Sequence, residues 1–522
     1  MLKSGANITQ KIGFSKRTSY FFVLTKVKVG AYSAISVLKS NQHAEKLLSL
    51  PRIFNSFTTF SPLNREILRI AGPSIITNIT VPLLGIVDLA IVGHLPDPAA
   101  IGAIAVGGLI FNMVYWLFNF LRMGSSGLTA QAYGRRDLRS VVKVLRMGLT
   151  VALCCGIGIF LIQRPMEWAA HLIIAPSAEV WMLAVRYFRV RIWAAPAVLA
   201  LFDMNGWLVG MQNSRYPLYI AVGQNLLNIV SSYLLVFHCG MGVEGVALGT
   251  VMAQYAGLIA ALLLCRHEMQ LSTPLLTNNV DKARSADNKQ PIVDNSESIE
   301  LSYQQFFAVN RDIFLRMICL IAVTTAFTAY GARMGDVLLA ANTLLMQLFT
   351  LFSYFCDGIA LAGEALVGKY TGREQVQGGA SASNGKRGHG TEISRVVSRL
   401  FVWGWGVAAL FTLLYITAGK GVLGLLTDDP LTLEATTPYL MWAAAIPVCG
   451  MAAFMWDGIF IGATRTREMF LSLLIGAVLF FAGRWVLLRL MDDANNALWT
   501  AFLLYLVVRG LFLWRCWVRG SA

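Results

Sequence analysis

The chain has 522 residues, of which 56% are hydrophobic and only 14% are charged, and its mean hydropathy is +0.60. Soluble domains are about half apolar and about a quarter charged, so this composition excludes an ordinary soluble protein and indicates one that crosses the membrane many times. The 43 Lys and Arg outnumber the 28 Asp and Glu, but they gather in short gaps between apolar runs. That pattern is typical of membrane orientation and not of nucleic-acid binding.

The first apolar run, residues 67–92, carries one acid, Asp88. A charged acid at mid-membrane depth costs roughly 2.5 to 3.5 kcal/mol, so its side chain should face protein or water and not lipid. No basic residue lies within one helical turn of Asp88. We therefore expect Asp88 to carry an exchangeable proton; the alternative is an acid that is hydrogen-bonded within the bundle for packing alone.

Runs of about 20 apolar residues predict twelve transmembrane helices, so the predicted fold class is an all-α polytopic membrane protein. The predicted helices cover approximately residues 66–93, 100–122, 141–163, 180–210, 217–238, 245–265, 312–333, 337–366, 396–418, 434–461, 469–490 and 495–515. Basic residues are concentrated in every second gap between these helices. By the positive-inside rule, both ends of the chain are predicted to lie in the cytoplasm.

The two halves of the chain resemble each other. The residues Asn-Arg-Glu-Ile at 64–67, before the first predicted helix, return as Asn-Arg-Asp-Ile at 310–313, before the seventh. Because each copy holds six helices, the copies share one orientation and predict two six-helix bundles related by a pseudo-twofold axis along the membrane normal, with a cavity between them. The predicted domains are a basic N-terminal extension (1–62), an N-lobe (63–270), a cytoplasmic linker (271–308) and a C-lobe (309–519).

The extension of residues 1–62 holds nine Lys or Arg and a single acid, Glu45. It resembles an organelle transit peptide. A translation start assigned too far upstream, or a basic segment that lies on the membrane surface, explains it equally well. The predicted location of the protein is the inner membrane of a bacterium. The plastid envelope is the alternative if the extension is a transit peptide.

Several motifs in combination resemble the multidrug and toxic compound extrusion (MATE) family, and within it the DinF branch. They are NITVPLLGIVDLAIVGHL, LRMGSSGLTAQAYGRRD, GWLVGMQNSRYPL, NRDIFLRM and DGIFIGATRTREM, and the similarity extends over about residues 64–519. The resemblance implies a two-lobe antiporter, coupled to H+ or else to Na+, that exports amphipathic organic compounds by alternating access. It also implies that an aspartate late in the first helix responds to protons, and Asp88 occupies that position.

The resemblance further implies a stripe of Asn, Asn and Asp on the fifth helix. Asn225 and Asn228 match this stripe, but Ser232 stands at the acidic position. Asp203 on the fourth helix is a candidate for the missing proton-coupling acid. It lies about 200° around the helix from Asn205, so only one of the two can point squarely into the N-lobe cavity.

Two residues of the first helix precede Asp88 as candidates for cavity polarity and bending. Asn78 is a polar cavity candidate, and Pro82 removes a backbone hydrogen bond and so marks a bending point; a static kink is the alternative. We expect a charged Asp88 to accept hydrogen bonds from Asn225 and Asn228. Protonation should then favour bending at Pro82, shrink the N-lobe cavity and displace the substrate.

The predicted C-lobe helices also contain acids, namely Asp357, Glu364 and Asp457. Asp357 and Asp457 each precede a glycine and are candidates for packing or gating, while Glu364 lies close to the cytoplasmic end of its helix. The sequence alone assigns none of the three a role.

Rival functions differ in the residues that they require. The sequence contains no HExxH, GxSxG or Walker A motif, so we predict no enzyme, no cofactor and no metal site. The predicted partners are a small organic molecule, H+ or Na+, and membrane lipid, and the protein is expected to be a monomer. The strongest alternative is a lipid or glycolipid flippase, which should have a more basic cavity. No cluster of intramembrane Lys or Arg appears on the cavity helices beyond Arg122, Arg316 and Arg333, which lie near the predicted helix ends.

Overall fold

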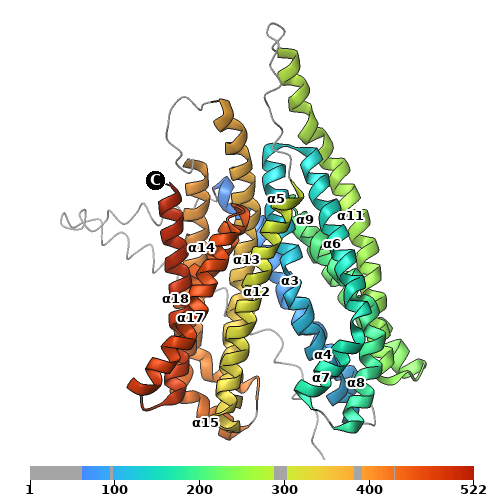
Figure 1. Ribbon diagram of the computed structural model, residues 1–522, viewed down its shortest axis with the longest axis vertical. Helices are drawn as coiled ribbons and strands as arrows, with labels where there is room; N and C mark the ends of the chain where they lie inside the picture. The colour runs from blue at the N-terminus through green and yellow to red at the C-terminus, as the bar shows by residue number, and fades with distance from the viewer. Residues whose placement is uncertain are drawn as a thin grey trace, which may run out of the picture. The chain divides into compact units, whose positions relative to one another are not determined.

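The computed structural model describes residues 61–93, 98–175, 177–286, 302–380, 391–427 and 429–521. Nearly all of the predicted basic extension lies outside these ranges. Within them, every regular element is helical (Figure 1). We call the helices up to residue 286 the N-lobe and those from residue 303 onward the C-lobe.

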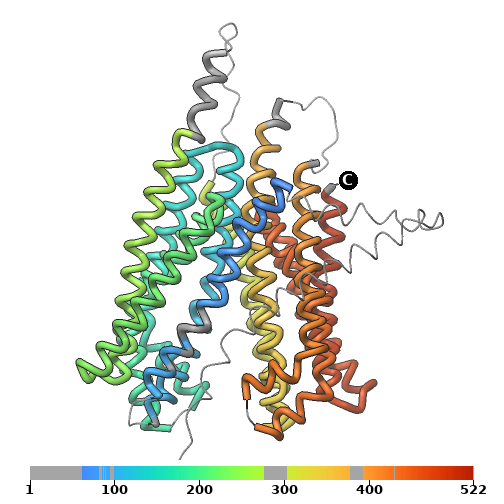
Figure 2. Tube along the Cα trace, turned by 180° about the vertical axis from the view of Figure 1, so that it is seen from behind, coloured from blue at the N-terminus to red at the C-terminus, as the bar shows by residue number. Residues whose placement is uncertain are grey.

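The N-lobe contains the following helices: α3 (Pro62–Gly93), α4 (Pro98–Leu117), α5 (Phe120–Arg135), α6 (Leu138–Leu161), α7 (Gln163–Ile174), α8 (Ala178–Arg191), α9 (Ala195–Gly210), α10 (Arg215–Tyr233) and α11 (Gly242–Ala286). A 3-10 turn, Ile192–Ala194, joins α8 to α9, so that these two helices form one membrane span. Helices α10 and α11 pack side by side (Figure 2).

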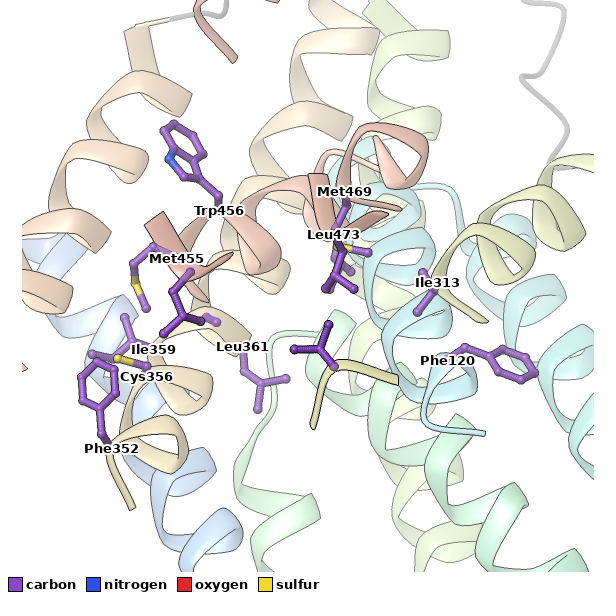
Figure 3. Packing of buried hydrophobic residues seen from close by; sticks show 14 of the residues in the cluster. Phe120, Ile313, Phe352, Cys356, Ile359, Leu361, Met455, Trp456, Met469 and Leu473 are labelled. Carbon is purple, nitrogen blue, oxygen red and sulfur yellow. The ribbon is translucent and has the colours of Figure 1, made fainter. Parts of the chain in front are cut away.

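The C-lobe contains α12 (Tyr303–Ala332), α13 (Asp336–Ala380), α14 (Thr391–Gly424), α15 (Pro430–Thr436), α16 (Leu440–Gly462), α17 (Thr466–Leu490) and α18 (Ala494–Ser521). Helix α13 packs extensively on α16, and α17 packs on α18. Figure 3 shows part of an apolar core cluster with residues from both lobes, in which Phe352 and Cys356 of α13 lie near Met455 of α16.

The predicted fold class is confirmed. Eleven segments of the described residues are long and apolar enough to cross a membrane, and the 32-residue α3 supplies the twelfth long helix. The main differences from prediction lie at helix ends. Helix α11 continues to Ala286, beyond the predicted start of the linker at 271, and α12 begins at Tyr303, about nine residues before the predicted helix.

A second difference concerns the segment after the second predicted helix. That helix was expected to end near residue 122, but α5 continues it to Arg135 after a short break at Phe118 and Asn119. Most residues of α5 are buried despite its polar sequence. Small residues explain this, since a Cβ added at Gly127 would lie only 2.3 Å from the backbone oxygen of Ile461 on α16. The helix is therefore a packing seam between the two lobes.

Helix α7 was not predicted. It is amphipathic, with Trp168, Leu172 and Ile173 exposed and Glu167 buried. Glu167 accepts hydrogen bonds from Arg189 of α8 at 2.9 and 3.0 Å. At 12 residues the helix is too short to cross a membrane, which is why a search for long apolar runs passes over it.

Candidate functional site

Asp88 lies in the last two turns of α3 and is only 5% exposed. Its Oδ1 atom is buried without a hydrogen-bond partner. No ion pair to the Asp88 carboxyl occurs among the residues that the structure describes. The predicted buried acid is thus in place, and its unsatisfied oxygen leaves it free to exchange a proton or accept a new donor.

A charged group within electrostatic range of Asp88 comes from α8, far away in the sequence. Asp88 lies within electrostatic range of Arg191 and Tyr187. The Arg191 guanidinium donates a hydrogen bond to the Tyr187 hydroxyl and sits over the Phe111 ring, 5.2 Å from its centroid. The sequence rule that looked for a base within one helical turn of Asp88 could not find this residue.

The two asparagines of α10 are occupied elsewhere. Asn225 donates to the backbone oxygen of Thr80 on α3 at 3.1 Å, and Asn228 donates to Thr250 Oγ1 on α11 at 3.0 Å. Among the described residues neither asparagine donates to Asp88, so the hydrogen bonds expected from them to a charged Asp88 are not made in this state. Asn225 nevertheless links α10 to α3 two residues before Pro82.

The first helix also touches the C-lobe. Asn78 donates to the backbone oxygen of Tyr354 on α13 at 3.2 Å. Helix α3 runs without interruption through position 82, from Pro62 to Gly93. The proline therefore stands in a continuous helix in this state, next to an interlobe contact that a bend would disturb.

Asp203 occupies a different place from Asp88. It is fully buried on α9, where Ser125 of α5 donates to its Oδ1 and its Oδ2 has no partner. A Cβ added at Gly148 of α6 would overlap this carboxyl. Asp203 thus lies where α5, α6 and α9 of the N-lobe pack together. Its neighbour on the helix, Asn205, is partly buried with an unpartnered Oδ1.

Ser232 is not close to Asp203. Ser232 is fully buried against α11, where a Cβ added at Gly249 would lie 2.4 Å from its Oγ. Asp203, in contrast, lies within electrostatic range of Cys265, which is also on α11. Positions 249 and 265 are about 24 Å apart along a helix. The structure therefore does not bring the two positions together into one site.

The C-lobe acid Asp457 is tightly paired. On α16, its Oδ2 accepts hydrogen bonds from Arg316 of α12 and from Arg509 of α18, the latter at 2.7 Å. All three side chains are less than 10% exposed. Because α12 begins at Tyr303, Arg316 lies inside the helix and not near its end as the sequence suggested. This ion triad was missed because its members are separated by more than 50 residues.

The two lobes touch through the half of the helices that the sequence places toward the cytoplasm. Lys369 of α13 pairs with Glu66 of α3, Gln131 of α5 donates to the backbone oxygen of Gly462 at 2.9 Å, and Gln212 donates to that of Ala365 at 2.8 Å. Among the described residues, the interlobe hydrogen bonds and ion pairs all lie in this cytoplasmic half of the helices or near the middle of the helices.

The two remaining C-lobe acids line this interlobe region differently. Glu364 is 2% exposed, and its Oε2 lies 4.0 Å from Nη1 of Arg122 on α5. Asp357, two turns earlier on α13, is exposed between buried neighbours and lies within electrostatic range of Arg122 and Arg316. No cluster of three potential metal-binding side chains occurs in the described part of the chain.

These features define a class of protein: a two-lobe bundle of membrane-spanning helices with buried charged groups and a closed contact on one side. Comparison with known proteins gives the family. The MatE family model matches residues 73–234. The chain is 36% identical over 456 residues to the DNA damage-inducible protein F of Escherichia coli (strain K12), with 87% of this chain and 92% of that protein covered. The chain therefore belongs to the MatE family, in its DinF branch.

More distant relatives agree with this assignment. The chain is 24% identical over 460 residues to the protein DETOXIFICATION 44, chloroplastic, of Arabidopsis thaliana, covering 86% of this chain and 81% of that protein. A crystal structure of MATE in the bent conformation shares the fold, with a TM-score of 0.71, 17% sequence identity, and coverage of 88% of this chain and 96% of that chain.

Proposed function

We propose that the protein is a proton-coupled antiporter that exports amphipathic organic compounds by alternating access. Asp88 carries this proposal, because a buried carboxyl with a free oxygen and no ion pair can bind and release a proton. Membership of a transporter family supports it. Sodium is the alternative coupling ion.

The interlobe contacts fit one step of such a cycle. Contacts that close the predicted cytoplasmic side leave the opposite side as the direction in which the lobes can separate. We assign this structure to the outward-facing state. The cycle then requires that the pair of Glu66 and Lys369 and the glutamine contacts break when the protein turns inward.

We propose that the protein is a monomer in the cytoplasmic membrane of a bacterium. Its similarity to the Escherichia coli protein supports the bacterial location. The similarity to a protein whose name places it in the chloroplast keeps the plastid envelope as the alternative. Asp203 is a second proton-binding candidate, since it is fully buried and, among the described residues, receives a side-chain hydrogen bond from Ser125 alone, on its Oδ1.

A lipid flippase is the second candidate, and the arginines inside the helix bundle favour it. Arg316 and Arg509 are buried and Arg122 is partly buried, and Arg509 is a basic group that the sequence analysis did not count. Arg316 and Arg509, however, share Asp457, and Arg122 lies beside Glu364. Because these acids offset the arginine charge, the site is less suited to an anionic headgroup than a flippase requires.

The test uses purified protein in liposomes, with a pH gradient as the driving force and ethidium, a planar lipophilic cation, as the probe. We expect wild-type protein to move ethidium and the Asp88→Asn variant to lose this activity while folding normally. The matched control is Asp336→Asn, which changes an exposed acid at the start of α13 in the same chemical way. Undiminished ethidium transport by Asp88→Asn, or flipping of a fluorescent lipid without any ethidium transport, would overturn the proposal.

A further inference from the structure

The Asp88 carboxyl and the Arg191 guanidinium are neighbours that do not pair. Arg191 is the last residue of α8. Its guanidinium lies 5.2 Å from the ring centroid of Phe111 and 5.4 Å from that of Tyr187, and it donates a hydrogen bond to the Tyr187 hydroxyl. Within the described residues, no ion pair joins Arg191 to an acid.

The aromatic position of Arg191 is built into the fold. Tyr187 is fully buried, and its ring fills the space where a Cβ at Gly107 of α4 would lie, at 2.4 Å. The Phe111 ring is stacked on Phe188 with centroids 5.0 Å apart. A guanidinium over such rings gains about 0.5 to 2 kcal/mol from the cation–π attraction. Arg191 therefore has a stable place to stay while it is not paired with an acid.

An ionised Asp88 would compete with these rings for the guanidinium. A buried carboxylate without a partner is costly, and an opposite charge within about 4 to 6 Å stabilises it strongly. Arginine can reach such a partner because its long side chain ends in five donors that match a carboxylate. Asp88 Oδ1 and the Tyr115 hydroxyl are both buried without a partner, and both groups lie within electrostatic range of Arg191. Pairing with Arg191 would give Asp88 Oδ1 a donor.

We propose that Arg191 is the switchable counter-ion of Asp88, resting on Tyr187 and Phe111 while Asp88 is protonated and pairing with the carboxylate once the proton leaves. This inference rests on the proposed function, because it assigns a positioning residue to the same proton-binding site. Loss of the proton from Asp88 on α3 would thereby move the side chain of Arg191 at the end of α8. This end of α8 adjoins the 3-10 turn that divides the fourth membrane span.

The groups that face Asp88 keep this assignment specific. Helix α8 contributes Tyr187 and Arg191, and the Tyr115 hydroxyl of α4 lies within electrostatic range of Arg191. The polar groups of α10, Asn225 and Asn228, do not titrate and donate to other residues. Arg191 is thus the one cation that the described residues place within electrostatic range of Asp88.

The experiment follows the protonation of Asp88 by infrared spectroscopy of protein in lipid bilayers. Only a protonated carboxyl shows the carboxylic C=O band, and the part of this band that disappears in Asp88→Asn belongs to Asp88. Loss of the band with rising pH is compared in wild type, Arg191→Gln and Arg191→Lys. The matched control is Arg186→Gln, which removes an exposed arginine from the same helix.

In Arg191→Gln, we expect the pH at which half of the Asp88 band is lost to rise by about 1 to 3 units. Arg191→Lys, which keeps the charge, should shift it by less than Arg191→Gln, and Arg186→Gln should leave it unchanged. Equal midpoints in wild type and Arg191→Gln, with the Asp88 band still titrating, would overturn the role of Arg191 alone. An Asp88 band that does not titrate in wild type would overturn the proton-coupled function together with this inference.

Discussion

The two lobes each bury an aspartate inside the membrane, but they treat it in opposite ways. In the N-lobe, Asp88 has an unpartnered oxygen and a nearby arginine that rests on aromatic rings. In the C-lobe, Asp457 is held by two arginines through one carboxylate oxygen. The same side chain is thus available for proton exchange in one lobe and committed to an ion triad in the other. Burial alone therefore does not distinguish an acid with a free oxygen from one that is held in an ion pair.

Breaking the C-lobe triad should have the largest effect on stability. Asp457→Asn would leave Arg316 and Arg509 buried with reduced compensation, and removing one partner of a buried ion pair typically costs about 3 to 5 kcal/mol. We expect a strongly lowered melting temperature in detergent and poor yield. Asp336→Asn is the control, because that acid is exposed at the start of α13, away from the triad. Equal thermal stability of Asp457→Asn and wild type would contradict the structural role of the triad.

Asp203 tests whether a third buried acid behaves like Asp88 or like Asp457. Because it receives a hydrogen bond only from Ser125 on its Oδ1, we expect Asp203→Asn to fold normally and to lower ethidium transport by about tenfold, a barrier change of about 1.4 kcal/mol. Adding Ser232→Asp should not restore transport, since Ser232 packs against Gly249, far from Asp203. Recovery in the double variant would show that the two positions serve one site. Full activity of Asp203→Asn would make this acid structural.

The contact between Lys369 and Glu66 tests the assignment of the outward-facing state. The Lys369→Met variant removes an ion pair whose side chains are 10% and 33% exposed, which should weaken closure by about 1 kcal/mol and shift the population toward the inward-facing state about fivefold. Electron spin resonance distances between labels at the cytoplasmic ends of α5 and α13 measure this shift. Lys420→Met, an exposed lysine of α14, serves as control. An unchanged distance distribution in Lys369→Met would contradict the proposal that this ion pair helps to hold the cytoplasmic side closed.

The smallest effect is expected at the cap of α15, outside the region of coupling. Hydrogen bonds from the Thr432 side chain and from the backbone of residues 431 and 432 lower the pKa of the exposed Asp429. A carboxyl with a lowered pKa stabilises the folded state above its ordinary pKa, and this contribution disappears as the pH falls through the lowered value. Hydrogen exchange in α15 should therefore increase slightly at acid pH and in Asp429→Ala at neutral pH. Identical exchange in Asp429→Ala and wild type at neutral pH would contradict the cap.

Sequence reasoning predicted the membrane class, the twelve helices and the family, because long apolar runs and local motifs are properties of neighbouring residues. It also selected Asp88 as a buried acid. It could not find Arg191 or the partners of Asp457, since these contacts join residues between 52 and 141 positions apart or on separate helices. The burial of α5 was hidden for a related reason, because its small polar residues only become interior when a second lobe packs on them.

The central claim is that Asp88 exchanges its proton for substrate. The most direct measurement is proton release on addition of ethidium to purified protein in weakly buffered solution, recorded with a pH-sensitive dye. We expect about one proton released per bound ethidium in wild type and none in Asp88→Asn, with Asp336→Asn behaving as wild type. Proton release of equal size from Asp88→Asn would contradict the account.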